Sequence, residues 1–269
     1  MATLMAEQLT LKPGDRVLDL GCGRGQSSVF LASQFGAEVV ALDLWVGAAE
    51  RKRSALQASV GRLVTPLQGD IARGLPSSFG SFDAIFCLQS FHCYGTRVST
   101  LRYLASLLKA GGSICFAQGC FRQEPDALPS LFRETDGWHV EYDKYHSPGW
   151  WRNHLQASGR FDVATAQEVP DGDILWEDDV LYRGDRAGWS DDFLADSAWL
   201  IRQIAHGRAS TPTLTHCLVR AVKSDRKENR HDPDPTHRAP VHTRKCAEES
   251  SNSGGCVEFK GSRARGARL

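Results

Sequence analysis

Residues 16–25 read Arg-Val-Leu-Asp-Leu-Gly-Cys-Gly-Arg-Gly, a short apolar stretch that runs into three glycines at alternate positions. The pattern predicts a β-strand, a glycine turn and then a helix over about 26–34. Such a turn lets a ligand reach the backbone, because a side chain at Gly21, Gly23 or Gly25 would block the approach or forbid the backbone angles. The unpaired N–H groups and the positive dipole end of the helix point to the same place. The segment therefore predicts a cradle for a nucleotide-like ligand.

Further apolar stretches follow at the intervals of an alternating α/β chain. Strands are predicted at 38–43, 64–68, 82–89, 113–118, 161–169 and 214–222, and helices at 98–108, 148–158 and 193–205. Residues 109–112, Lys-Ala-Gly-Gly, predict the end of the helix before them, because a cation and glycines are typical of helix C-termini. The fold class predicted by this order is α/β: a doubly wound, Rossmann-like seven-stranded sheet in a three-layer αβα sandwich.

Four motifs in this order resemble those of the class I S-adenosylmethionine-dependent methyltransferases, and in particular their small-molecule, type 11-like members. Residues 19–25 (D-x-G-x-G-x-G) resemble the first motif of that family. Asp43 ends the second strand, residues 69–71 (Gly-Asp-Ile) follow the third, and residues 108–112 (L-K-A-G-G) precede the fifth, each as the family pattern requires. The resemblance in architecture covers about 13–223 and implies that the last strand is antiparallel. Its specific motifs stop near residue 118.

The resemblance implies S-adenosyl-L-methionine as the cofactor. Asp43 is placed to accept both ribose hydroxyls, as in related α/β folds. Asp70 is expected to accept from the adenine amine, the N–H of Ile71 to donate to the ring, and Gln89 to lie at the methionine portion. The candidate cofactor-binding residues are Asp19, Gly21, Gly23, Gly25, Asp43, Leu44, Asp70, Ile71 and Gln89.

Several of these residues also have a purely structural interpretation. Asp43 could cap the next helix, since acids are favoured at strand-to-helix junctions. Asp70 could serve a turn, and Asp19 could bond only the backbone of the glycine loop. Leu44 and Trp45 could pack against adenine, and Trp45 could instead belong to the core.

Two other functions remain open. NAD(P)-dependent dehydrogenases use G-x-G-x-x-G, and here Ser28 stands where the last glycine would be. A methyltransferase-like protein that binds the cofactor without catalysis is the other alternative. Only residues 1–15 precede the first strand, whereas many small-molecule methyltransferases carry a longer segment that covers the cofactor.

Methyl transfer from a sulfonium requires a positioned acceptor and, for some acceptors, a base that removes a proton. His92 is the first candidate for this catalytic role, because it follows the end of the fourth strand, where ligands bind in open α/β sheets. His146 is the second candidate, and His92 could equally be a packing or capping residue. Phe91, Tyr94 and Trp151 are candidates to surround the cationic sulfur.

Composition argues against a nucleic-acid or membrane partner. The 32 Lys and Arg residues are balanced by 32 Asp and Glu residues, so no overall field attracts a polyanion. No apolar run reaches the roughly 18 residues that suggest a membrane span. The 8 cysteines form no C-x-x-C pair or zinc spacing, which predicts reduced thiols and no metal site. We expect a cytoplasmic protein with a small-molecule methyl acceptor, and the oligomeric state is left open.

The predicted domain covers 1–223. Residues 119–147 and 170–213 are expected to be insertions or cap elements that face the acceptor. Residues 224–269 are rich in charged residues, Ser, Pro and Gly and have no apolar periodicity, which predicts a disordered tail.

Overall fold

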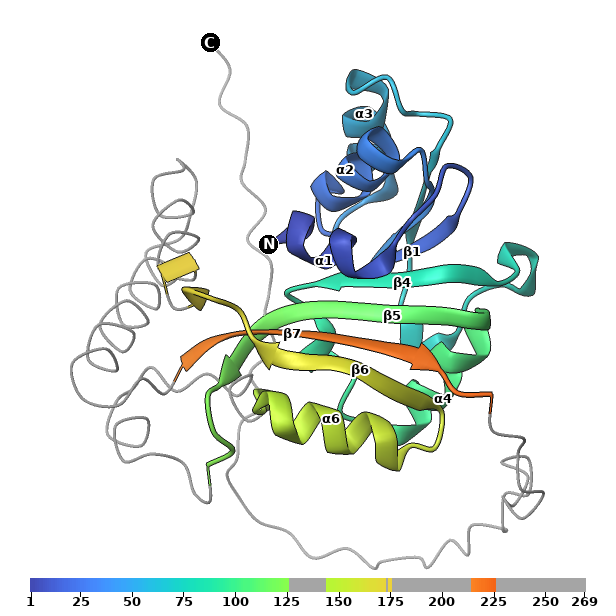
Figure 1. Ribbon diagram of the computed structural model, residues 1–269. Helices are drawn as coiled ribbons and strands as arrows, with labels where there is room; N and C mark the ends of the chain where they lie inside the picture. The colour runs from blue at the N-terminus through green and yellow to red at the C-terminus, as the bar shows by residue number, and fades with distance from the viewer. Residues whose placement is uncertain (126–143, 173, 176–213, 226–269) are drawn as a thin grey trace, which may run out of the picture. The chain divides into compact units, whose positions relative to one another are not determined.

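The strands of the computed structural model form a seven-stranded sheet in the order β3-β2-β1-β4-β5-β7-β6 (Figure 1). Strands β1 to β5 are parallel to one another, whereas β7 is antiparallel to both β5 and β6. This confirms the predicted doubly wound sheet and the antiparallel last strand. The strands are β1 (Arg16–Leu20), β2 (Glu38–Asp43), β3 (Val64–Gln68), β4 (Phe82–Leu88), β5 (Leu108–Phe121), β6 (Phe161–Glu168) and β7 (Leu214–Lys223).

The structure describes residues 1–125, 144–172, 174–175 and 214–225. The predicted helix at 193–205, most of the two predicted insertions and all but the first two residues of the predicted tail lie outside these residues. The described helices are α1 (Ala2–Leu9), α2 (Gln26–Phe35), α3 (Ala48–Gln57), α4 (Val98–Leu107) and α6 (Pro148–Ala157), with 3₁₀ turns η1 (Ile71–Arg73), η2 (Ser77–Phe79) and η3 (Phe91–Cys93). In this part of the chain, no helix is long and apolar enough to cross a membrane.

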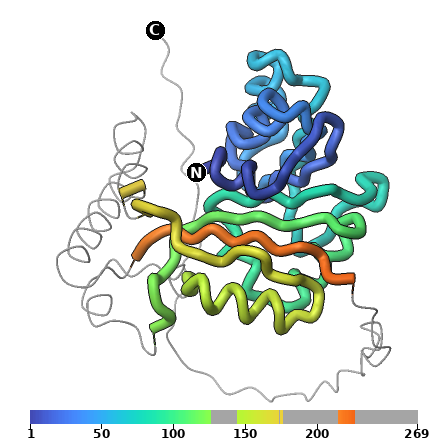
Figure 2. The backbone as a smooth tube through the Cα atoms, in the orientation of Figure 1, coloured from blue at the N-terminus to red at the C-terminus, as the bar shows by residue number. Residues whose placement is uncertain are grey.

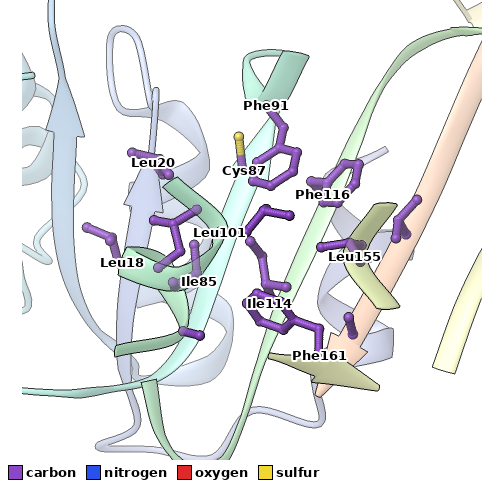
Figure 3. Packing of buried hydrophobic residues seen from close by; sticks show 14 of the residues in the cluster. Leu18, Leu20, Ile85, Cys87, Phe91, Leu101, Ile114, Phe116, Leu155 and Phe161 are labelled. Carbon is purple, nitrogen blue, oxygen red and sulfur yellow. The ribbon is translucent and has the colours of Figure 1, made fainter. Parts of the chain in front are cut away.

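The helices form the two outer layers, because successive strand residues alternate between the faces of the sheet. On one face, Leu18 and Ile85 pack with side chains of α4 and α6. On the other face, Val17 and Phe86 pack with side chains of α1, α2 and α3. Figure 3 shows the first of these cores, where Leu101, Ile114, Phe116, Leu155 and Phe161 gather between the sheet and its helices.

The prediction that glycines end the helix before the fifth strand is wrong. Helix α4 ends at Leu107, and its C-cap Leu108 is already extended and pairs with Phe82 of β4. Nζ of Lys109 lies 2.7 Å from Oδ2 of Asp83 near the start of β4. The charge of Lys109 therefore stabilises this end of the sheet and not the C-terminus of α4. The fifth strand therefore begins five residues earlier than predicted and runs beside β7 over residues 113–121 (Figure 2).

Candidate active site

A pocket opens where the carboxyl ends of β1, β2, β3 and β4 meet at one edge of the sheet. Parallel strands bring their following loops together there, which is the usual ligand position in this architecture. Five of the predicted cofactor-binding residues line it, namely Gly21, Asp43, Leu44, Asp70 and Ile71. The complete lining among the described residues is Leu20, Gly21, Leu42, Asp43, Leu44, Trp45, Gly69, Asp70, Ile71, Ser90, Cys93 and Tyr94.

The glycine loop is held by backbone hydrogen bonds at the end of β1. The N–H groups of Gly21 and Cys22 both donate to the carbonyl of Leu42, at 2.8 and 3.1 Å. Gly21 has a φ of +70°, and a Cβ atom there would overlap the hydroxyl of Ser90. Only glycine therefore fits this position, for a steric reason in addition to the backbone angle.

Asp43 ties the glycine loop to the turn after β2. Its Oδ2 accepts the N–H of Gly23 at 2.8 Å, and its Oδ1 accepts the N–H groups of Trp45 and Val46 at 2.8 and 2.9 Å. The interpretation of Asp43 as a helix cap is wrong, because the N-cap of α3 is Gly47 and has no side-chain cap. The carboxylate is buried and fixed, and it faces the pocket.

Asp19 lies beneath the glycine loop and is fully buried. Its Oδ2 accepts the hydroxyls of Ser27, at 2.7 Å, and Ser28, at 2.5 Å. Its Oδ1 has no hydrogen-bond partner among the described residues. Burial, which the two serine hydrogen bonds only partly offset, raises the pKa of Asp19 to about 6. The Ser28 that breaks the dehydrogenase fingerprint is thus a hydrogen-bond partner of the first acidic residue of the motif.

The raised pKa of Asp19 predicts a stability that falls as the pH rises. Between its ordinary value of 3.8 and about 6, the folded state binds more protons than the unfolded state, so the free energy of unfolding decreases as pH increases. Above pH 6 the buried charge costs about 3 kcal/mol, from a shift of roughly two pKa units. Asp19→Asn should therefore be more stable than the wild type at pH 8 and gain little at pH 4. Urea unfolding of both proteins at pH 4 and pH 8 measures their free energies of unfolding. A difference between the two proteins that is the same at both pH values would refute the prediction.

Asp70 and the residues after Asp43 also line the pocket. Oδ1 of Asp70 accepts the N–H of Ala72 at 2.9 Å and so caps the start of η1, as the structural interpretation expected. Asp70 thus has both a structural role and a place in the pocket lining. Ile71 is buried beside it. Trp45 is 85% exposed, which excludes the interpretation of this residue as part of the core. Its indole and the half-exposed Leu44 lie at the pocket rim, available to a planar ligand.

Gln89 faces away from the pocket. Its backbone has a φ of +63°, and its Oε1 accepts the N–H of Gly119 at 3.2 Å. Its amide nitrogen contacts Nε2 of His216 on β7. Its side chain is thus directed toward β5 and β7, and Gln89 is not among the residues that line the pocket. A role at the methionine portion of a cofactor stays a prediction.

Sequence reasoning missed a cluster of hydroxyl groups at the end of β1. The Ser90 and Tyr94 hydroxyls lie 2.9 Å apart, and the Ser90 hydroxyl donates to the Leu20 carbonyl at 3.1 Å. The thiol of Cys87 contacts both, and burial raises its pKa to about 12, so it stays protonated. Tyr94 lines the pocket with its hydroxyl next to Gly21, and its role beside the sulfur stays a prediction.

The other two predicted aromatic residues belong to the core. Phe91 and Trp151 are both fully buried, and the Phe91 ring stacks on Phe116 with centroids 4.1 Å apart (Figure 3). The prediction that they surround the cofactor sulfur is therefore wrong. Their apolar rings stabilise the segment that carries Tyr94.

Neither candidate base is among the described residues that line the pocket. The backbone N–H of His92 donates to Oε1 of Gln118 at 2.8 Å, and its ring is buried with an edge against Tyr145. His146 is more accessible: its Nδ1 lies 2.7 Å from Oε1 of Glu124, and its ring stacks on Trp150 with centroids 3.5 Å apart. A catalytic role for either histidine stays a prediction.

Residues 17–112, which contain the glycine loop, Asp43 and Asp70, match the family described as "Methyltransferase domain". Over these residues the chain is similar to methyltransferase domains. Among curated proteins, this domain is similar to 27-O-demethylrifamycin SV methyltransferase of Amycolatopsis mediterranei, with 30% identity over 125 residues, which cover 46% of this chain and 46% of that protein. The chain spans between 22% and 50% of the length of such curated relatives.

Solved structures share the fold of this chain. A SAM-dependent methyltransferase from Geobacter sulfurreducens, in complex with S-adenosyl-L-homocysteine, aligns with a TM-score of 0.60 and 19% identity over 83% of this chain and 90% of the other. The [4+2]-cyclase SpnF aligns with a TM-score of 0.62 and 19% identity over 82% of this chain and 79% of the other. At this identity the likeness concerns the fold, and the chemistry must be argued from the site.

Proposed function

We propose that the domain binds S-adenosylmethionine in the pocket and catalyses transfer of its methyl group to a small-molecule acceptor. One observation carries the proposal: the glycine loop, Asp43 and Asp70 converge on one pocket at the carboxyl edge of the sheet. A carboxylate between two loops suits a diol, and a second acid beside a backbone N–H suits the edge of adenine. The family match over 17–112 supports the same assignment.

The residues present fit this cofactor. Gly21 is part of the pocket lining, and the absence of a Cβ atom there leaves room for the hydroxyl of Ser90. Oδ2 of Asp43 accepts a single backbone N–H and keeps acceptor capacity, so a ribose hydroxyl can donate to it. Asp70 would accept a hydrogen bond from the adenine amine, and the exposed Trp45 at the rim would be available to stack on the ring. The cofactor supplies an activated methyl group, and the protein positions the acceptor nucleophile in line with it and excludes water.

Proton removal, where the acceptor needs it, is assigned to His92 or His146. Glu124 holds Nδ1 of His146 and leaves Nε2 as the possible proton acceptor, the arrangement in which a carboxylate orients a general base. The ring of His92 is almost fully buried. We further propose a reducing, cytoplasmic location, which six described free cysteines support, and no nucleic-acid partner.

Calorimetric titration with S-adenosylhomocysteine tests the binding step, with NADH as the competing dinucleotide. We expect S-adenosylhomocysteine to bind with micromolar affinity and NADH to leave this binding unchanged. Displacement by NADH would favour a dehydrogenase instead. Transfer of a radiolabelled methyl group to fractionated small-molecule extract then tests catalysis. Binding without any labelled product would favour the second candidate, a cofactor-binding protein without methyl transfer; the fold also occurs in a [4+2]-cyclase.

A further inference from the structure

Arg51, in the first turn of α3, is a buried cation beneath the pocket, with only 1% of its surface exposed. One terminal nitrogen donates to the carbonyl of Gly23 at 3.3 Å and to that of Val46. The other donates to the carbonyl of Leu67 at 2.9 Å. These three carbonyls belong to the glycine loop, the turn after Asp43 and the end of β3. One guanidinium therefore joins the three segments that build the cofactor side of the pocket.

Burying the charge of Arg51 at this position costs free energy. Removing an ion from water costs several kcal/mol, and an apolar side chain of similar volume often stabilises a core at least as well. Arg51 makes no salt bridge with a described carboxylate, and its Nε has no hydrogen-bond partner among the described residues. The three carbonyl groups compensate part of this cost, and the attraction between Arg51 and Asp19 slightly limits the rise that burial causes in the pKa of Asp19. A need for core volume alone does not explain an arginine here.

The third glycine of the loop leaves room for this side chain. Gly25 is the N-cap of α2 with a φ of +82°, and a Cβ atom there would lie 3.2 Å from Cγ of Arg51. The aliphatic part of Arg51 thus passes directly over Gly25 to reach the three carbonyls. Gly25 and Arg51 are complementary in shape, one on each side of the junction between α2 and α3.

We propose that Arg51 is a positioning residue that fixes the three pocket segments relative to one another and thereby sets the affinity for the cofactor. The inference depends on the proposed function, because the affinity concerned is that for S-adenosylmethionine. Arg51 touches the backs of the loops through their carbonyls and does not line the pocket. Its loss should therefore weaken cofactor binding, with little effect on the transfer step once the cofactor is bound.

The test is calorimetric titration of the full chain with S-adenosylhomocysteine, for the wild type, Arg51→Lys and Arg51→Met. Arg53→Met is the matched control, because Arg53 lies two residues further along α3 and is exposed. We expect affinity to fall about 10-fold in Arg51→Lys and about 100-fold in Arg51→Met, because an ammonium cannot reproduce the planar fork of a guanidinium. Arg53→Met should bind as the wild type does. In the methyl-transfer assay, KM for S-adenosylmethionine should rise in parallel while kcat changes less than about twofold.

Chemical rescue separates positioning from general destabilisation. In Arg51→Ala, millimolar guanidinium ion should restore part of the affinity, because the Nε atom that links it to the chain has no hydrogen-bond partner among the described residues. A variant that is folded by circular dichroism and binds within twofold of the wild type would overturn the inference. If Arg51→Met does not fold, Arg51→Lys decides by the same criterion. A wild type that does not bind S-adenosylhomocysteine would instead overturn the proposed function.

Discussion

Replacing Gly21 by alanine is expected to abolish measurable binding of S-adenosylhomocysteine, a loss of at least about 100-fold. The left-handed backbone conformation costs a residue with a Cβ about 1–2 kcal/mol. The larger effect is steric, because the new Cβ would overlap the Ser90 hydroxyl and lie 2.7 Å from the Ser90 Cβ. Ser90 is held by the Leu20 carbonyl and by Tyr94, so its displacement would disturb the pocket wall. Calorimetry measures the affinity, and thermal unfolding shows whether the variant is folded.

Gly111→Ala is the matched control for this substitution. Gly111 has a φ of +71°, almost the value of Gly21, but a Cβ atom there meets nothing within 4 Å. The control should therefore lose about 1 kcal/mol of stability and keep its affinity. In Gly21→Ala/Ser90→Gly the overlap is removed, and part of the affinity should return. Equal binding by Gly21→Ala and Gly111→Ala would show that the close approach to Ser90 does not matter.

Asp43→Asn is expected to weaken cofactor binding by about 100-fold, because hydrogen bonds to a charged group are worth roughly 1.5–3 kcal/mol. An asparagine keeps only one acceptor oxygen. It must therefore present its NH₂ group either to the Gly23 N–H or to the N–H groups of Trp45 and Val46, so one of the two loops is released. The ribose hydroxyls then lose both the charge and a fixed partner. Calorimetric titration with S-adenosylhomocysteine is the measurement.

Asp83→Asn provides the comparison for this variant. Asp83 also accepts a backbone N–H, that of Arg16 at 2.8 Å, but it lies near the start of β4, at the edge of the parallel sheet opposite the pocket. The hydrogen bond from Lys109 holds the pKa of Asp83 below its usual range, although desolvation opposes this shift. The Asp83 variant should lose stability while its affinity for the cofactor is retained. A similar loss of affinity in both variants would mean that Asp43 acts only through general stability.

The sequence was sufficient to predict the sheet and most of the pocket. Apolar runs of strand length alternate with helical patterns, which predicts parallel strands. Asp43 and Asp70 each directly follow such a strand, and parallel strands end at the same edge of the sheet, so the two acids were expected to meet there. Gln89 was predicted at the methionine portion, but the direction of its side chain toward β7 could not be predicted, because Gln89 has a positive φ, which is uncommon for a residue other than glycine. Arg51 could not be recognised either, since it occurs in Glu-Arg-Lys-Arg, a run typical of a solvated helix surface. Burial of one arginine in such a run is decided by tertiary packing alone.

The position of Cys93 at the pocket makes this protein accessible to covalent chemistry. Cys93 is exposed, whereas Cys22, Cys87, Cys115 and Cys120 are buried, with pKa values that burial raises. Within the described part of the chain, an alkylating reagent therefore meets the Cys93 thiol first. A small electrophile attached there would occupy the mouth of the pocket, and a bound ligand would slow its attachment. The same thiol can anchor a tethered fragment library with which to search for the acceptor.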